Sequence, residues 1–165
     1  VLEALRPHLR SALPGFAEHD LRGAEPLARL SGQDGMAEAV SRGTVTPDHV
    51  IRIKPWPMVI PADADAGTVA QAAEAFAASY TRYFEAHTDG SLTMLDRSPR
   101  VVFVPGAGVI GLGRNKTEAR INADLAEQNL RVAASAEALG GYQPLPRHEQ
   151  FRIEYWELEQ AKLRK

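Results

Sequence analysis

Apolar side chains recur at helical spacing in five parts of the chain, and these parts predict helices. The clearest is residues 66–86, where an apolar stripe would form one buried face. Shorter helices are expected over residues 1–13 and 36–42, and an aromatic helix over residues 150–164. The stripe of the 66–86 helix consists of Val69, Ala73, Phe76, Tyr80, Tyr83 and Phe84.

The longest predicted helix covers residues 116–139. Asn115 and Glu118 resemble a capping pair, in which side chains satisfy free backbone amides at the helix start. Gly140 and Gly141 would end the helix, since glycine is favoured just past a helix end. We expect the buried face of this helix to consist of Ile121, Leu125, Val132, Ala136 and Leu139.

Strands are predicted where apolar residues cluster or alternate between turn residues. Residues 100–104 predict a strongly apolar strand, and residues 49–54 alternate in a way that favours a strand with two different faces. Residues 58–60 would extend the second of these, and weaker strands are expected within 21–30 and 92–95. Strands alternating with helices predict an α/β layered fold, here with a mixed or partly antiparallel sheet.

A glycine-rich segment follows the apolar strand. Gly106, Gly108 and Gly111 match the G-x-G-x-x-G pattern, which in dinucleotide-binding proteins lets the backbone approach a pyrophosphate at a helix start. A cofactor-binding loop is therefore one interpretation. The β-branched, glycine-broken run that follows does not favour a helix, however, so the next helix begins too late for such a loop. We therefore expect a β-hairpin over residues 101–112, packed by the long helices over 66–86 and 116–139.

The composition is that of an ordinary globular protein, with 44% hydrophobic and 24% charged residues. The 19 basic and 21 acidic residues are well mixed and give a net charge of -2, which argues against nucleic acid or a membrane surface as a partner. The absence of cysteine excludes disulfides and thiolate chemistry and fits a cytoplasmic location. No apolar run approaches the roughly 20 residues of a membrane span.

The length favours a single domain. We expect one α/β domain over residues 1–147, and over residues 148–165 an aromatic helix or linker toward a following domain. The sequence begins at Val1 and ends at Lys165, in both cases inside a helical pattern. We therefore interpret the chain as a piece of a longer protein.

A short glycine-rich strand at residues 107–113 is followed directly by a helix start at residues 114–119. This succession resembles class II aldolases of the aldolase/adducin family and implies a class II aldolase-like fold. In that family, a histidine at the position of Ala107 is a ligand of the catalytic divalent metal. Because a methyl group cannot bind a metal, we expect no metal site in this chain.

Longer stretches are similar to a more specific group of proteins; they are residues 21–23, 46–54, 99–113, 117–120 and 154–163. These stretches resemble the region between the two catalytic parts of bifunctional proteins that join a rhamnulose-1-phosphate aldolase to a short-chain dehydrogenase. The resemblance implies a parent protein of carbohydrate metabolism that splits or forms a sugar phosphate with a divalent metal. It also implies an NAD(P)-dependent oxidation in the parent.

Neither active site is expected within this chain. No two of its five histidines are two residues apart, so the aldolase His-x-His metal pair is absent. No tyrosine is followed four residues later by lysine, so the dehydrogenase Tyr-x-x-x-Lys pattern is absent. We therefore expect an auxiliary or degenerate aldolase-like domain, inactive by itself and free of cofactor. Its partners would be its own flanking domains and, in a homo-oligomer, other copies. A non-catalytic interaction module is the remaining alternative.

The strongest candidate site lies in the stretch from Asp48 to Lys54, which belongs to the resemblance. His49, beside Asp48, could polarise a carbonyl group or bind a metal, so these two are the catalytic candidates. Arg52 and Lys54 could hold a phosphate or another part of the substrate. The simpler interpretation is a turn histidine followed by a solvated strand face.

Two further arginines, Arg100 and Arg114, flank the predicted hairpin and are candidates for the same phosphate. Arginines in such positions more often face solvent. Tyr155 and Trp156 lie in the predicted C-terminal helix and would either anchor a neighbouring domain or pack on the core of this one.

Overall fold

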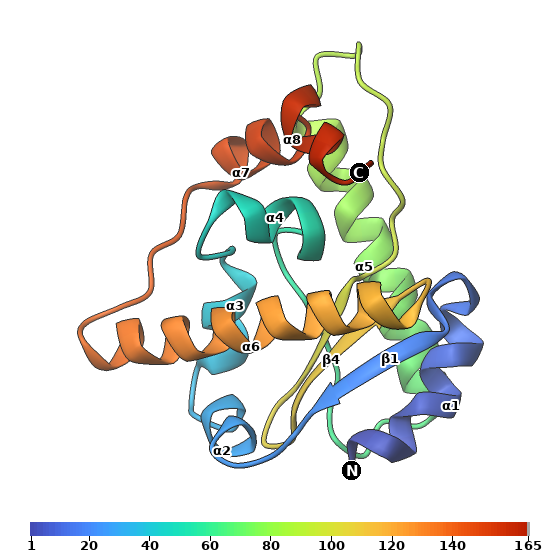
Figure 1. Ribbon diagram of the computed structural model, residues 1–165, viewed down its shortest axis with the longest axis vertical. Helices are drawn as coiled ribbons and strands as arrows, with labels where there is room; N and C mark the ends of the chain where they lie inside the picture. The colour runs from blue at the N-terminus through green and yellow to red at the C-terminus, as the bar shows by residue number, and fades with distance from the viewer. Residues whose placement is uncertain (165) are drawn as a thin grey trace.

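The computed structural model describes residues 1–164 and is built around a mixed four-stranded sheet (Figure 1). The strands are β1 (Glu18–Arg22), β2 (Met58–Val59), β3 (Val101–Val104) and β4 (Gly108–Gly113), in the spatial order β1-β4-β3-β2. Strand β4 pairs antiparallel with both β1 and β3, whereas β2 pairs parallel with β3. The predicted α/β fold with a mixed, partly antiparallel sheet is confirmed.

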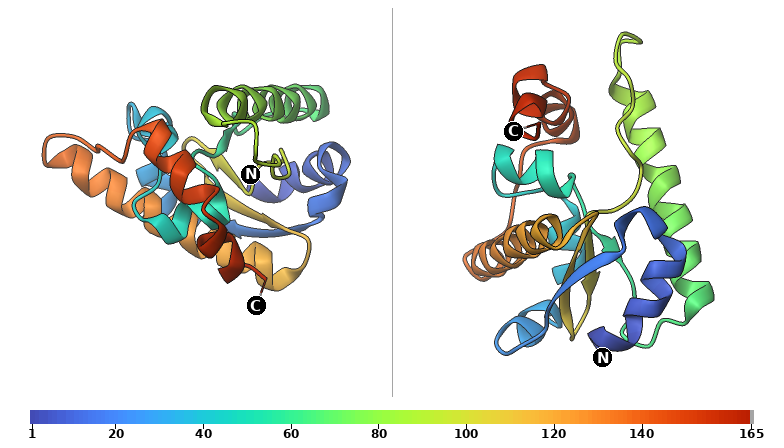
Figure 2. Two further views of the ribbon diagram at one scale, coloured as in Figure 1. Left: turned by 90° about the horizontal axis from the view of Figure 1, so that it is seen from above. Right: turned by 45° about the vertical axis from the view of Figure 1, so that its right-hand side comes forward.

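Helices cover both faces of the sheet (Figure 2). α1 (Leu2–Ala12) and α5 (Ala66–His87) pack against each other on one face. α6 (Lys116–Ala138) crosses the other face, accompanied by α2 (Leu27–Ser31) and α3 (Met36–Ser41). Because neither face meets solvent, successive β3 side chains enter two different apolar clusters, and the whole strand is buried.

The remaining helices are the short η1 (Pro14–Phe16) and a group formed by α4 (Pro47–Ile53), α7 (Arg147–Glu154) and α8 (Glu157–Lys162). The last three contact one another at one end of the molecule (Figure 1). Two helices therefore stand where one was expected over 150–164. Within residues 1–164, no helix is both long and apolar enough to cross a bilayer.

Helix α7 is joined to the main core. The ring of Phe151 packs in the apolar cluster of α1, α5 and the sheet, and only 5% of the residue is exposed. The Tyr155 ring stacks on it, with ring centroids 4.5 Å apart. Trp156, one residue later, is 54% exposed. The two aromatic residues therefore have different surroundings, while the proposed division of the chain at residue 147 stays a prediction.

The expected hairpin is confirmed as β3, a turn over residues 105–107, and β4. The turn is closed by the Ala107 amide, which donates to the Val104 carbonyl at 3.0 Å. Gly106 has φ 74°, a left-handed conformation that glycine adopts without the usual steric cost. Helix α6 begins only after β4 ends, as the sequence predicted.

The start of α6 also agrees with the prediction. The Asn115 side chain accepts a hydrogen bond from the Glu118 amide at 2.9 Å. The Glu118 carboxylate reaches back to the Arg114 amide at 2.8 Å, one residue earlier than in a standard capping box. The first contact satisfies a backbone amide that the first helical turn leaves free, and the second fixes the residue that precedes the N-cap.

The predicted apolar stripe of α6 was wrong at Val132, which is 36% exposed, and at Leu139, which is 89% exposed, whereas Leu125 and Ala136 are partly buried against the core. The buried face consists mostly of small and amide side chains, and Leu130 is its one large residue. A Cβ atom at Gly111 would overlap the backbone of Ala119, and one at Gly113 would lie 2.7 Å from the Asn115 carbonyl oxygen. The glycines thus let α6 lie directly on β4, and large side chains would not fit. The buried residues of α6 are Ala119, Asn122, Ala123, Ala126, Asn129, Leu130, Ala133 and Ala134.

Three predicted strands were wrong. Residues 49–54 belong mostly to helix α4, whose N-cap Thr46 accepts a hydrogen bond from the backbone amide of His49, with Pro47 at the first helical position. Threonine followed by proline is a helix start, and this local signal prevails over the alternation. The strand expected within 21–30 is instead β1 followed by α2. Residues 92–95 form no strand.

Candidate functional site

A cleft of about 790 Å³ lies where the end of α4, the segment before β3 and the start of α6 meet α7 and α8. All four cationic candidates from the sequence line it, although they come from three separate parts of the chain. Three carboxyl side chains stand among them. The charged lining residues are Arg52, Lys54, Asp96, Arg100, Arg114, Glu118 and Glu154.

Lys54 lies at the inner wall of the cleft, with only 4% of the residue exposed. Its Nζ donates to the Asp96 carbonyl oxygen at 2.6 Å and stands 3.5 Å from the centroid of the Tyr80 ring. Burial lowers the pKa of Lys54 to about 7, and Arg100 contributes in the same direction, while Glu154 and Asp96 oppose it. The amine is therefore unlike an ordinary surface lysine.

Arg100 and Arg114 form the outer wall. The Arg100 guanidinium donates to the Asp96 carboxylate at 3.1 Å and lies 4.2 Å from the centre of the Phe16 ring. The Arg114 guanidinium lies 5.7 Å from the same ring and pairs with Glu118 at 3.2 Å. Only 11% of the Arg100 side chain is exposed, against 67% for Arg114. The cations thus run from a buried lysine to an exposed arginine at the rim.

Glu154 of α7 is the centre of a buried polar network. The residue is 1% exposed, and its carboxylate accepts hydrogen bonds from the hydroxyls of Tyr80 at 2.8 Å and Tyr83 at 3.0 Å. The Tyr155 hydroxyl is 2.8 Å from that of Tyr80 and accepts from the Leu95 amide at 3.1 Å. Burial raises the pKa of Glu154, although Lys54 and the two donating tyrosines oppose that shift.

Sequence reasoning missed Glu154, Asp96 and the tyrosines. Tyr80 and Tyr83 were assigned to the core stripe of their helix, and they are buried as predicted. Their hydroxyls, however, need acceptors once buried. The available signal was Glu154 itself, a single acid between Ile153 and Tyr155 in a run of large apolar side chains.

His49 and Asp48 are absent from this cleft's lining. His49 is buried, its Nδ1 lies 2.7 Å from the Thr46 hydroxyl, and its Nε2 has no hydrogen-bond partner among residues 1–164. Burial lowers the pKa of His49, partly opposed by Gln128 and Asp48. Asp48 is exposed and pairs with Lys162 at 3.2 Å. The two catalytic candidates therefore lie outside the lining of the cleft that the four cations share.

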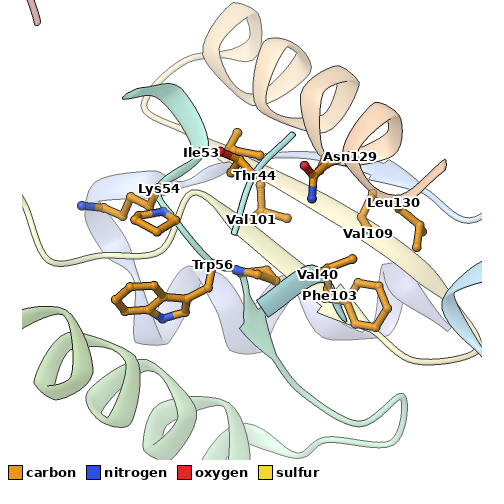
Figure 3. A pocket seen from close by; sticks show the side chains of 13 residues that line it. Val40, Thr44, Ile53, Lys54, Trp56, Val101, Phe103, Val109, Asn129 and Leu130 are labelled. Atoms are coloured by element: carbon orange, nitrogen blue, oxygen red, sulfur yellow. The ribbon is translucent and has the colours of Figure 1, made fainter. Parts of the chain in front are cut away.

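A second, much smaller pocket of about 20 Å³ lies between α4, the hairpin and α6 (Figure 3). Its lining is mostly apolar, and the Asn129 amide is one of its few polar groups. Such a volume holds about one water molecule. Lys54 contributes to this lining too, but its amine points away from Asn129 (Figure 3). The amine therefore belongs to the larger cleft.

The side chains around the hairpin do not fit a divalent metal. The Ala107 methyl group, at the position of the family's histidine ligand, lies in the apolar core. No group of three or more histidine or acidic side chains suited to a metal comes together within the part of the chain that the structure describes. No chemical step is therefore assigned to a metal here.

The three glycines of the G-x-G-x-x-G pattern do not open a helix. Gly106 is in the hairpin turn, and Gly108 and Gly111 are strand residues of β4. A Cβ atom at Gly108 would overlap the Arg22 carbonyl of β1, so this position is packed against a neighbouring strand. The helix that a phosphate loop would feed begins at Lys116, beyond the far end of β4. The pattern is explained by the positive φ of the turn at Gly106 and by close packing of backbone segments at Gly108 and Gly111.

This fold is that of a known enzyme family. The model of the family described as "Aldolase class II, second domain" matches residues 1–163. The chain therefore belongs to this family of class II aldolase-like domains. The expected class II aldolase-like fold is thereby confirmed.

Individual relatives agree with the family. The chain is 30% identical over 135 residues to the uncharacterized oxidoreductase YuxG of Bacillus subtilis (strain 168), a match that covers 77% of this chain and 20% of YuxG. Solved structures of YgbL, named as a candidate aldolase/epimerase/decarboxylase, have the same fold at 17% identity and a TM-score of 0.55. The Klebsiella pneumoniae protein matches over 86% of this chain and 58% of its own, and the Escherichia coli protein over 92% and 64%.

Proposed function

We propose that this chain is an auxiliary aldolase-like domain of a bifunctional enzyme that joins a sugar-phosphate aldolase to an NAD(P)-dependent short-chain dehydrogenase. In this proposal, the domain binds the phosphate group of the sugar in its cationic cleft. The observation that carries the proposal is the convergence of Arg52, Lys54, Arg100 and Arg114 on one cleft. The resemblance to bifunctional rhamnulose-1-phosphate aldolases supports the same substrate class.

The arginines of the cleft suit a phosphate chemically. A guanidinium group donates two parallel hydrogen bonds to a phosphate and stays charged at all working pH values. The Arg52 guanidinium makes no hydrogen bond or ion pair with any residue between 1 and 164, so its donors are free for a ligand. Arg100 and Arg114 are held by Asp96 and Glu118, which leaves further donors on each guanidinium.

The catalytic groups of the parent are assigned to other domains. The divalent metal would be held by the flanking aldolase part and NAD(P) by the dehydrogenase part, in the cytoplasm. The name of YuxG as an oxidoreductase, of whose length this chain covers 20%, supports a redox activity in a longer relative. This proposal is tested in the full-length parent, by assaying cleavage of rhamnulose 1-phosphate and reduction of NAD(P)⁺ separately.

The phosphate site is tested by calorimetric titration of the chain with inorganic phosphate and with rhamnulose 1-phosphate. We expect saturable binding that Arg52→Gln weakens by about ten-fold, as expected for one charge-assisted contact. Arg131→Gln is the matched control, because Arg131 pairs with Glu127 outside the cleft. Equal binding by the two variants would contradict the site.

Added NADH separates this proposal from a nucleotide-binding loop at Gly106, Gly108 and Gly111. We expect an unchanged melting temperature, since Gly108 and Gly111 are closely packed and Gly106 forms the hairpin turn. A saturable rise with NADH would favour the nucleotide-binding alternative.

A further inference from the structure

Lys54 has a backbone conformation that is unusual for its residue type. It is the C-cap of α4, with φ 65° and ψ 170°, and it is the one non-glycine residue with positive φ within residues 1–164. Side chains with a Cβ atom adopt this region only at a cost, and such strain is concentrated at functional sites. Glycine would end the helix here without that cost, so the position retains a side chain that has a use of its own.

The surroundings of the Lys54 amine are those of a nucleophile rather than of a structural ion pair. Lys54 makes no ion pair with any carboxylate of the described chain, and its Nζ is held by the Asp96 carbonyl and the Tyr80 ring. In its neutral form the amine donates one hydrogen to that carbonyl and keeps its lone pair. Lysines become nucleophilic when they are desolvated beside another cation, and Arg100 is that cation here.

We infer that the Nζ of Lys54 forms an imine with an aldehyde or ketone that binds in the cleft. The lone pair of the neutral amine forms the new C–N bond, and the carbonyl oxygen departs as water with the two amine hydrogens. The imine then takes up one proton and becomes an iminium ion. Burial favours the neutral form of Glu154, which lines the same cleft, but a cation at Lys54 favours its ionised form, which then provides the opposite charge.

The carbonyl compound would carry a phosphate. Lys54 is buried at the inner wall and the arginines extend toward the rim, so a short phosphorylated aldehyde would place its phosphate outward and its carbonyl inward. This inference rests on the proposed function, because both use the same cleft. It adds a covalent step that phosphate binding alone does not require.

Reductive trapping tests the inference on the whole chain. The probes are glycolaldehyde phosphate and glycolaldehyde, each with sodium cyanoborohydride at pH 7, which reduces an iminium ion to a stable amine. Peptide mapping by mass spectrometry then compares Lys54 with the exposed Lys116 in the same molecule. At pH 7 about half of Lys54 is neutral, against fewer than about one in a thousand ordinary lysines. We expect labelling of Lys54 to be faster by about ten-fold or more, even with restricted access.

The outcomes separate the two proposals. Labelling at Lys116 with none at Lys54 would overturn the imine, and calorimetric phosphate binding would then still support the proposed function. Equal labelling of Lys54 by both probes, unaffected by inorganic phosphate, would support the amine but contradict the phosphate site. Faster labelling by the phosphorylated probe, with competition by phosphate, supports both. Lys54→Met should remove the adduct while circular dichroism shows a folded chain.

Discussion

Two regions of this molecule, the glycine-rich hairpin and the cationic cleft, differ in what their residues do. The hairpin contains the recognisable glycine pattern, whose glycines form its turn at Gly106 and let β4 pack closely on β1 at Gly108 and on α6 at Gly111. The cleft contains no recognisable pattern, yet it collects a lysine, three arginines and three carboxyl groups from parts of the chain far apart in sequence. A glycine pattern can therefore reflect backbone geometry and packing rather than a binding site. Chemical groups can gather where no local motif indicates them.

The largest expected effect tests the packing role of Gly111. We expect Gly111→Val to destabilise the chain by about 3 kcal/mol or more, because overpacking here displaces a helix backbone. Gly15→Ala is the matched control, since a Cβ atom at Gly15 meets nothing within 4 Å. Chemical denaturation measures both. A Gly111→Val variant as stable as the unchanged chain would show that Gly111 is not needed for close packing of α6 on β4.

The next effect tests whether the cleft region also depends on packing. We expect Glu154→Ala to cost about 3 kcal/mol, because it leaves the buried Tyr80 and Tyr83 hydroxyls without their acceptor. Glu154→Gln should cost less, since an amide oxygen still accepts a hydrogen bond. Glu149→Ala, on the same helix and paired with the exposed Arg152, should change stability by only about 0.5 kcal/mol. Comparable losses of stability for Glu149→Ala and Glu154→Ala would show that the buried hydrogen bonds of Glu154 do not stabilise the fold.

A smaller effect concerns pH. The pKa of Lys54 is about 7 when folded, against 10.5 as its ordinary value, so the unfolded chain binds more protons between these limits. Stability should therefore rise with pH across this window, by up to about 1.4 kcal/mol per unit from this group. Lys54→Met should remove that contribution, and urea denaturation at pH 7.5 and 9 measures the difference. Parallel pH profiles for the two proteins would contradict the unusual amine.

The smallest effect is expected at Leu139, just past the end of α6. Leu139 was predicted to be buried but is 89% exposed, so Leu139→Lys should change stability by no more than about 0.5 kcal/mol. Ala123→Leu, on the inner face against Gly111, should be strongly destabilising by comparison. Thermal unfolding distinguishes the two variants. A large loss of stability in Leu139→Lys, with none in Ala123→Leu, would instead support the buried face that the sequence predicts.

Much of the fold could be predicted from the sequence because the signals are local. The 66–86 helix, the hairpin and the Asn115 cap each depend on neighbouring residues, and the structure has all three. The stretch 49–54 was misassigned because its alternation was given more weight than the helix start at Thr46 and Pro47. The buried face of α6 was misassigned for another reason. The glycines of the neighbouring strand decide which side chains fit there. The spacing of apolar residues along the helix does not depend on that strand and could not predict it.

The site was predicted only in part. All four cations were identified as single residues, but their meeting in one cleft depends on the tertiary fold. Glu154 was missed because a lone acid in an aromatic run gives no indication of its partners. Tyr80 and Tyr83 lie more than 70 residues earlier in the sequence.

The arrangement of the sheet has a consequence for the order in which the chain folds. The first strand, Glu18–Arg22, pairs with Gly108–Gly113, so its neighbour is synthesised long after it. Closing such a distant contact carries an entropic cost that local helices avoid, and folding slows as contacts become more distant. At about 5–20 residues per second, several seconds of translation separate the two strands. During that interval the apolar face of Leu2–Ala12 lacks much of the core against which it is finally buried, so chaperone binding to this face is expected until the later strands emerge.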